Sequence, residues 1–264
     1  MNCTHSRRRL AAFVAACLAG SLPAAADAEP PVFSVVAGAE YTSGDYGGDK
    51  SIDEFYVPVT GTMDFERVTL RLTVPFLSVT APEYTTISGP DGQPIVGEGP
   101  RVTESGLGDV LASATLYDLF SAAGGDFAVD LTGKIKFGTA DADKGLGTGE
   151  QDYFVQFDAF RFFERSTLMG SVGYAVRGEP DDYELDNTWF ASIGASRAVT
   201  DTVRLGAFYD FRQASVPDSD ALQELSAWVS TRLGANGRAQ FYLLAGFGDS
   251  SPDWGAGLSF GTSF

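Results

Sequence analysis

The chain repeats one pattern, in which large apolar residues alternate with small or polar residues over long segments. In the segment 127–137, every second position is apolar or glycine, and Asp130, Lys134 and Lys136 fall between. Strict alternation places the two sets on opposite faces of a β-strand. No stretch keeps apolar residues three and four positions apart for three turns, as an amphipathic helix requires. The pattern therefore predicts an all-β protein.

Twelve segments show this alternation, and most of them are ten or more residues long. They cover 32–42, 53–63, 67–79, 106–117, 126–137, 152–162, 167–177, 187–198, 202–213, 221–233, 238–248 and 253–264. Strands of soluble sheets are typically about 5–6 residues long, whereas a tilted strand needs about 9–11 residues to cross a bilayer. The lengths therefore favour strands that span a membrane.

The connections between these segments alternate between short and long. The short ones lie at 64–67, 163–166, 199–201 and 234–237, with a somewhat longer turn at 118–125; the long ones lie at 42–54, 80–104, 138–152, 178–187, 214–220 and 248–253. The long set holds 21 acidic residues and only three basic ones. Short turns at one end and long loops at the other, with an even strand number, are typical of outer-membrane barrels. We expect a closed antiparallel transmembrane β-barrel of about 12 strands, with short periplasmic turns and longer acidic extracellular loops.

The last strand continues the alternation to the end of the chain. Trp254, Ala256, Leu258, Phe260 and Phe264 would face lipid, and small residues between them would face the lumen. In a closed barrel this strand pairs with the first one. A terminal Phe on an amphipathic strand resembles the signal by which bacterial barrels are recognised, so we expect Phe260 and Phe264 to contact the barrel-assembly machinery. Aromatic residues near the turns, namely Phe65, Phe162, Phe163 and Phe264, are expected at the membrane interface.

The first 28 residues are typical of a secretory signal peptide. A basic stretch with three arginines precedes an apolar run of about 11 residues, and Ala26 and Ala28 form an A-x-A cleavage site. A lipobox ending at Cys17 and a twin-arginine signal are the competing interpretations. Cleavage after Ala28 leaves residues 29–264 as the barrel domain and removes both cysteines and the only histidine.

Composition excludes several classes of function. The formal net charge of −17 opposes binding to nucleic acid. Hydrolysis by a Ser-His-Asp arrangement needs an imidazole, which the predicted mature chain lacks. We therefore expect neither an enzyme nor a cofactor. Asp141 and Asp143 offer oxygen ligands of the kind that Ca²⁺ prefers, but the spacing does not fit an EF-hand, and we expect a flexible loop there.

A soluble β-sandwich or lipocalin-like barrel is the alternative fold, because its strands also alternate. The polar faces carry ten charged residues, which would line the lumen of a membrane barrel or face water in a soluble one: Arg71, Asp130, Lys134, Lys136, Asp158, Arg204, Asp210, Arg212, Glu224 and Arg232. Two prolines, Pro58 and Pro75, fit poorly inside a closed sheet, and we expect them at bulges or strand ends.

Two stretches resemble hallmark segments of the outer-membrane family labelled as the MetA pathway of phenol degradation. They are "ESGLGDVLASATLYDL" at 104–119 and "GKIKFGTADADKGLGTGEQDY" at 133–153. The first carries the Gly-Leu-Gly-Asp strand start that ends at Asp109, and the second carries the Lys-rich strand and the Leu-Gly-Thr-Gly turn. Gly138 and Ala140 replace the family's usual proline and glycine. The resemblance implies a transport barrel in the outer membrane.

The expected function is therefore a passive channel for a small molecule, with aromatic or hydrophobic solutes as candidates. The alternative is a structural or surface-interaction barrel that does not conduct. Twelve strands lie between a packed eight-stranded barrel and an aqueous porin, so we expect a narrow lumen, partly closed by side chains and by the loop 80–104. We expect a monomer surrounded by outer-membrane lipid, with lumen charges of both signs in balance and weak cation preference set by the acidic loops.

Overall fold

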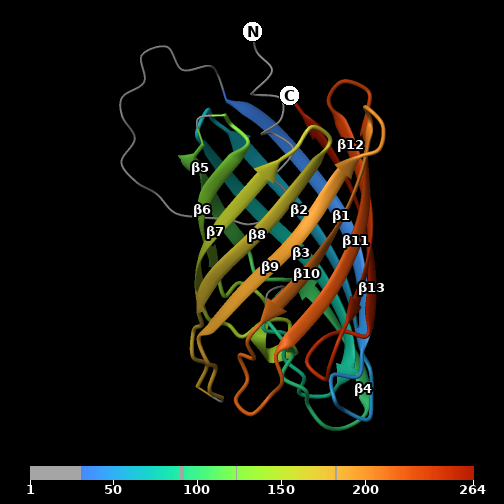
Figure 1. The fold of residues 1–264 in the computed structure, drawn as a ribbon. Helices are drawn as coiled ribbons and strands as arrows, with labels where there is room; N and C mark the ends of the chain where they lie inside the picture. Colours follow the sequence, from blue (N-terminus) through green and yellow to red (C-terminus); the bar gives the residue numbers. More distant parts are fainter. Residues whose placement is uncertain (1–30, 90–91, 123, 182) are drawn as a thin grey trace.

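Thirteen antiparallel strands in the described part of the chain close into one barrel (Figure 1). The computed structural model describes residues 31–89, 92–122, 124–181 and 183–264, so the predicted signal peptide 1–28 lies outside the described residues. The strands are β1 (Val32–Gly44), β2 (Ile52–Asp64), β3 (Val68–Pro82), β4 (Arg101–Leu107), β5 (Leu111–Ser121), β6 (Phe127–Lys136), β7 (Asp152–Phe162), β8 (Ser166–Val176), β9 (Thr188–Ala198), β10 (Val203–Arg212), β11 (Leu222–Leu233), β12 (Gly237–Gly246) and β13 (Trp254–Ser263). As predicted, the last strand pairs with the first, and the backbone N–H of Phe264 donates to the carbonyl of Phe33 at 2.8 Å.

The predicted twelve-stranded barrel is confirmed, because β4 and β5 occupy one position in it. Both pair with β3, and the ladder is irregular between them at Gly108 to Val110, although the N–H of Gly108 still donates to the carbonyl of Pro75 at 2.9 Å. Three residues of this segment stand opposite two residues of β3, one of which is Pro75. A proline has no N–H to donate, which explains why the ladder is interrupted at this point.

Pro58 on β2 is the direct cross-strand partner of Pro75. On its other side, the ladder between β1 and β2 is also interrupted, between the pairs Ala37–Val59 and Glu40–Tyr56. The two prolines therefore lie side by side where the ladders to the outer neighbours are irregular. This agrees with the expectation that they mark irregular points of the sheet.

The apolar faces of the strands point outward. Along β3, Leu70, Leu72 and Val74 are 39–51% exposed, whereas Thr69 and Thr73 between them are buried. The same exposed apolar band continues over β7 to β13, as at Phe157, Leu168, Val172, Ile193, Leu205, Phe241, Leu243 and Leu258. A soluble barrel would bury these side chains, so the lipocalin-like alternative is wrong and the band is suited to lipid.

The two ends of the barrel differ. We call the end that holds the short connections and Phe264 the turn end, and the end that holds the long connections the loop end (Figure 1). Phe65, Phe163 and Phe264 are exposed at the turn end, as expected for interfacial aromatics. The prediction that Phe162 lies at the membrane interface is wrong. Its side chain faces the barrel interior, because it alternates with exposed Arg161 and Phe163.

The longest connection folds into the loop end of the barrel. Its predicted range, 80–104, is too wide, since β3 extends to Pro82 and β4 starts at Arg101, which leaves 83–100. Ile87 from this loop and Leu146 from the connection 137–151 pack in one core with residues of β2 and β3, and the N–H of Ile87 donates to the carbonyl of Gly145 at 2.9 Å. Within the described ranges, no helix has the length and apolar character needed to cross a membrane.

Candidate functional site in the barrel lumen

The barrel interior holds a cavity of about 400 Å³. Its wall comes mainly from β1, β2 and β7 to β12, and loop 83–100 contributes Ile87, Gly89, Gly92 and Pro94. Ligand pockets typically measure about 300–1,000 Å³, so the space suits a small molecule. The interior of this barrel is therefore not completely filled by side chains, unlike that of a packed eight-stranded barrel.

Strand alternation explains which side chains reach the cavity. On β10, Leu205, Tyr209 and Phe211 are exposed on the outer face, whereas Arg204, Phe208, Asp210 and Arg212 line the cavity. The neighbouring strand β11 presents Glu224, Ser226, Trp228 and Ser230 in the same way. A shift of one residue in the register would exchange the two faces, which fixes these side chains in the lumen.

The structure distributes the ten predicted lumen residues over several sites. Four line the cavity: Arg204, Asp210, Arg212 and Glu224. Asp130 and Asp158 are buried and directly opposite each other on β6 and β7.

The other four predicted lumen residues lie in different surroundings. Lys134 lies 4.1 Å from the ring centroid of Phe154. Arg71 lies half-buried between outward-facing Leu70 and Leu72, and Arg232 is exposed near the turn end, where it donates to the carbonyl of Asp201. Lys136 belongs to a separate cluster.

The carboxylates of the cavity gather toward the loop end. Asp210 and Glu224 are direct cross-strand partners, and Glu224 accepts a hydrogen bond from Arg212 at 3.1 Å. Glu40 and Glu54 approach from β1 and β2, and Glu40 accepts a hydrogen bond from the hydroxyl of Tyr242. We call Glu40, Glu54, Asp210 and Glu224 the acidic pole.

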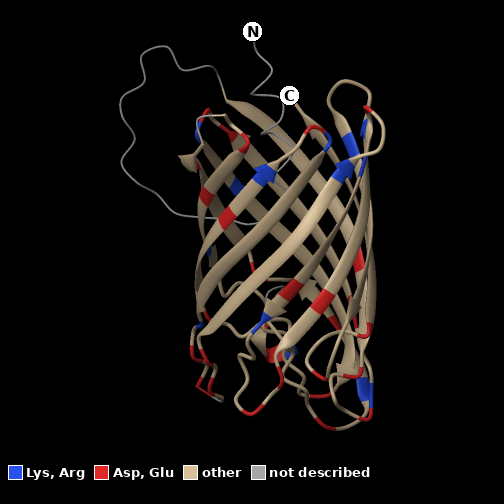
Figure 2. Ribbon diagram, viewed as in Figure 1, with Lys and Arg blue, Asp and Glu red and all other residues tan. Residues whose placement is uncertain are grey.

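The basic groups of the cavity, apart from Arg212, lie toward the turn end. Arg204 and Arg238 line the cavity there, next to Ser196, Ser230 and Gln240. Arg204 donates to the hydroxyl of Ser196 at 3.0 Å. We call Arg204 and Arg238 the arginine pole. In Figure 2, basic residues of β9 to β12 gather at the turn end and acidic ones nearer the loop end. We expected positive and negative charges to be balanced in the lumen. Along this wall, the two signs are instead separated from each other in the direction of the barrel axis.

Aromatic side chains lie between the two poles, over glycines of neighbouring strands. Phe208 pairs directly with Gly194, and Trp228 with Gly206. A Cβ placed on either glycine would lie within 2.4 Å of the partner ring. Each glycine therefore provides the space in which an aromatic ring lies against the wall, and this keeps the lumen open.

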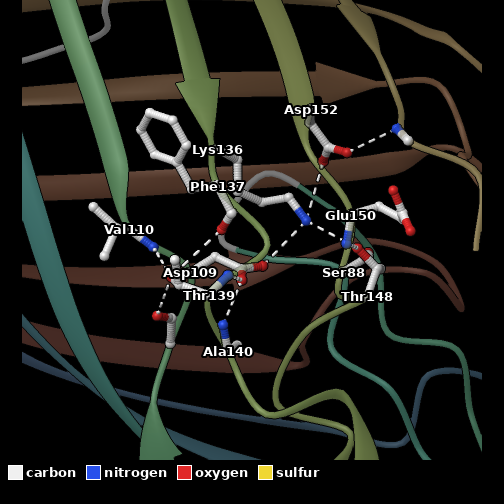
Figure 3. A network of polar contacts seen from close by, with 12 residues as sticks. Ser88, Asp109, Val110, Lys136, Phe137, Thr139, Ala140, Thr148, Glu150 and Asp152 are labelled. Carbon is white, nitrogen blue, oxygen red and sulfur yellow. Dashed lines mark hydrogen bonds and ion pairs between the residues drawn. The ribbon is translucent and has the colours of Figure 1, made fainter.

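A second polar cluster is buried beside the cavity, where β5, β6 and β7 reach the loop end (Figure 3). The Lys136 ammonium lies 3.1 Å from a carboxylate oxygen of Asp109 and 3.5 Å from one of Asp152, and it donates to the Thr148 hydroxyl at 3.0 Å. Arg177 forms an ion pair with Asp152 at 2.9 Å. We call Asp109, Lys136, Asp152 and Arg177 the ion clamp; all four side chains are at most 4% exposed.

The ion clamp fixes the polypeptide as well as the side chains. One oxygen of Asp109 accepts from the backbone N–H groups of Thr139 and Ala140 at 3.0 and 2.9 Å, and Asp152 accepts from that of Gly178 at 3.0 Å. Burial lowers the pKa of the Arg177 guanidinium, and the charge of Asp152 beside it acts in the opposite direction. The clamp therefore joins the interrupted strand, the connection 137–151 and the chain after β8.

The clamp also explains the Gly-Leu-Gly-Asp and Leu-Gly-Thr-Gly motifs. Asp109 and Thr148 supply clamp contacts, and Leu146 fills the adjacent apolar core. The weak calcium candidates Asp141 and Asp143 are exposed at the short turn η1 (Ala142–Lys144), and among the described residues no three carboxylate, histidine or cysteine side chains are placed so that they could hold one metal ion.

Sequence reasoning missed several residues of these sites. Glu54 falls in both the predicted strand 53–63 and the predicted loop 42–54, Trp228 falls on the polar face of the predicted strand 221–233, and Glu40, Arg238 and Tyr242 are not among the predicted lumen residues. All five stand at alternate positions of predicted strands or next to them, so the period-two pattern could have found them. Arg177 and Asp152 could not be paired from the sequence, because their contact depends on how two loops fold.

Comparisons with known proteins support the fold. No protein-family model and no curated protein matches the chain. Among solved structures, the COG4313 outer membrane channel from Pseudomonas putida F1 is similar with a TM-score of 0.68 at 15% identity, covering 92% of this chain and 97% of that one. The P. putida toluene transporter TodX gives 0.45 at 9% identity, with 91% of each chain covered. The CymD monoaromatic hydrocarbon channel gives 0.44 at 10%, with 89% of each covered. The chain has the closed twelve-stranded barrel fold of an outer-membrane channel.

Proposed function

We propose that this protein is a passive outer-membrane channel that admits a small molecule through its lumen. The observation that carries the proposal is a cavity of about 400 Å³ with polar and charged walls, inside a barrel whose outer face is apolar. The acidic loops would face the outside, and the turn end would face the periplasm, which is the usual orientation of such barrels. The barrel would act as a monomer in outer-membrane lipid.

A conductance measurement tests this function. Barrels refolded without residues 1–28 and inserted into planar bilayers should give discrete steps of current, and liposomes that contain them should swell in solutions of small solutes. Empty bilayers and heat-unfolded protein are the controls. Correctly folded barrels that give neither current nor swelling would contradict a channel function.

A structural barrel with a closed lumen is the second candidate, and one observation favours it. Loop 83–100 enters the loop end, where Ile87 packs against Leu77, Val79 and Leu146. In that case the cavity would be open only toward the turn end. The same bilayer experiment separates the two functions.

The solute class follows from the wall of the cavity. Phe208, Trp228, Tyr56 and Tyr242 supply aromatic surface there, and such surface binds planar rings through offset stacking or edge contacts. This agrees with the aromatic solutes that were expected as candidates, and the resemblance to the MetA-pathway family, which rests on 104–119 and 133–153, supports a transport barrel. Membership in that family is part of the proposal.

A further inference from the structure

The cavity has charged ends of opposite sign with aromatic surface between them. Among the described residues, the charges that line it are four carboxylates and Arg212 toward the loop end, and Arg204 and Arg238 toward the turn end. Asp210 and Arg204 both lie on β10, six residues apart, which is about 20 Å of strand at ~3.3 Å per residue. A solute in the cavity therefore meets both signs at once.

The arginine pole is built to receive an anionic group. Arg204 is the direct partner of Ser230, and Ser230 is the direct partner of Gln240, so three hydrogen-bonding side chains form a row across β10, β11 and β12. Two residues closer to the turn end of the barrel, Arg238 and Arg232 are direct partners of like charge. Like charges in this arrangement add to the positive potential at this end of the cavity, which favours an anionic group. The Nε of Arg204 is buried and has no hydrogen-bond partner.

The acidic pole is built to receive a cationic group. Among the described residues that line this part of the cavity, Arg212 is the one base, and it pairs with Glu224. Tyr46 and Tyr56 line the same part of the cavity, and a cation near aromatic faces gains a further attraction. The aromatic row between the poles consists of Trp228 and Tyr242, which are direct partners, with Phe208 beside them.

Resting on the proposed channel function, we propose that the cavity selects small aromatic zwitterions, with a protonated amine toward the loop end and a carboxylate toward the turn end. A single charge entering the lumen loses hydration and meets one pole of like sign. A zwitterion has each charge beside its opposite and its ring on the aromatic row. The ~20 Å separates backbone positions, and Arg204 shortens the gap by reaching along the wall to Ser196, the direct partner of Gly206. Charges at opposite ends of a ring come closer to both poles than charges on one carbon.

A set of four probes of similar size tests this specificity: 4-(aminomethyl)benzoate, 4-methylbenzoate, 4-methylbenzylamine and 4-methylbenzyl alcohol. Binding to the barrel folded in detergent is measured by NMR line broadening of the probe, with protein-free micelles subtracted. The zwitterion should bind with a Kd about tenfold lower than each of the other three. Equal affinity for all four probes would overturn the proposed specificity.

Two substitutions separate the poles. Arg204→Gln should weaken binding of the zwitterion and of the benzoate by about tenfold and leave the amine unaffected, whereas Asp210→Asn should weaken the zwitterion and the amine and leave the benzoate unaffected. Arg165→Gln, at a turn outside the cavity, makes the same charge change as Arg204→Gln and should alter none of the four. Gel mobility with and without heating verifies that each variant is folded.

The outcomes distinguish the two levels of the proposal. A barrel that conducts but binds all four probes alike, or whose zwitterion affinity survives both Arg204→Gln and Asp210→Asn, contradicts the specificity and leaves the channel function intact. A barrel that gives no current but shows the tenfold preference contradicts the channel function and supports the bipolar binding site.

Discussion

At the scale of single residues, Lys136 is a buried charge held between two carboxylates. Its ammonium lies between Asp109 and Asp152, and Arg177 pairs with the same Asp152. Removing one partner of a buried ion pair leaves an uncompensated charge and typically costs about 3–5 kcal/mol. Lys136→Met should therefore lower the free energy of unfolding by about 3 kcal/mol or more, as measured by urea titration in detergent micelles.

Lys144→Met is the matched control, because Lys144 is exposed at η1 and makes no ion pair shown in the structure. It should change the free energy of unfolding by less than about 0.5 kcal/mol. Equal stability of the two variants would show that the clamp contributes little.

Gly257 provides a second prediction at this scale. A Cβ on Gly257 would lie 2.4 Å from two ring atoms of Tyr242 and 2.6 Å from its hydroxyl oxygen. The ring therefore has to leave its place against β13, lose its hydrogen bond to Glu40 and enter the cavity. Gly257→Ala should reduce single-channel conductance in planar bilayers.

The double variant Gly257→Ala, Tyr242→Ala should restore the conductance, because it removes the displaced ring. Gly61→Ala is the control, since no atom lies within 4 Å of a Cβ built there. A reduced conductance that persists in the double variant would point to a change in the backbone of β13 instead.

At the scale of elements, loop 83–100 determines how open the loop end is. Thr86 and Ile95 exchange backbone hydrogen bonds at 2.9 and 2.8 Å, so the ends of the segment between them are already close. Replacing residues 88–93 with Asn-Gly should keep this pair as a short hairpin and remove Gly89 and Gly92, two of the four loop residues that line the cavity. The single-channel conductance should rise.

The control replaces residues 216–219 in the connection 213–221, which lies outside the cavity lining, with the same two residues. Its conductance should equal that of the unsubstituted barrel. An unchanged conductance after replacement of 88–93 would place the narrowest point elsewhere, between the aromatic row and the wall of β7 and β8.

The terminal strand supports a prediction about assembly. Phe264 is 76% exposed and Phe260 is 57% exposed, although β13 is fully paired with β1 and β12. Phe264→Ala should leave refolding in micelles unchanged and lower the amount of barrel in the outer membrane several-fold. Phe163→Ala removes an exposed ring at the same end outside β13 and should have no such effect. Equal losses for both variants would mean that any interfacial ring serves the purpose.

Much of the barrel could be predicted from the sequence, because each strand carries its own signal. A lipid-facing residue such as Leu70 and a lumen-facing residue such as Thr69 differ in polarity, and the pattern repeats along every strand. The loops carry no such signal. The length of the loop 80–104 led to the expectation that it partly closes the lumen, but its path could not be predicted, since this depends on contacts such as Ile87 with Leu146 that form only in the folded chain.

The site was predictable to the extent that it lies on strands. Alternation identifies Arg204, Asp210 and Glu224 as members of the polar face. It does not say where along the barrel axis each of these residues lies relative to residues of the other strands. The separation of charge into two poles could therefore be recognised only from the register between the strands in the structure. The resemblance pointed to Asp109 and Lys136 through motifs, and only the fold shows that they meet.

At the scale of the whole molecule, charge is distributed unevenly between the two ends. The six predicted loops hold 21 acidic and three basic residues, and acidic residues are concentrated in the loop-end connections (Figure 2). Together with the acidic pole, they attract cations to that mouth of the barrel. The arginine pole acts in the opposite direction at the other end of the cavity. The selectivity of the channel depends on which of the two regions is screened less.

We expect weak preference for cations at low salt, because the loop charges and the acidic pole together outnumber the two arginines. The screening length is about 8 Å at 0.15 M salt and about 3 Å at 1 M, so the contribution of the exposed loops should fade as salt rises. Reversal potentials under a KCl gradient at several mean concentrations measure this trend. Replacing Glu179, Asp181 and Glu184 by their amides should reduce the preference at low salt, whereas Glu164→Gln at the turn end should not. Anion preference at low salt would show that the arginine pole, rather than the loops, controls the passage of ions.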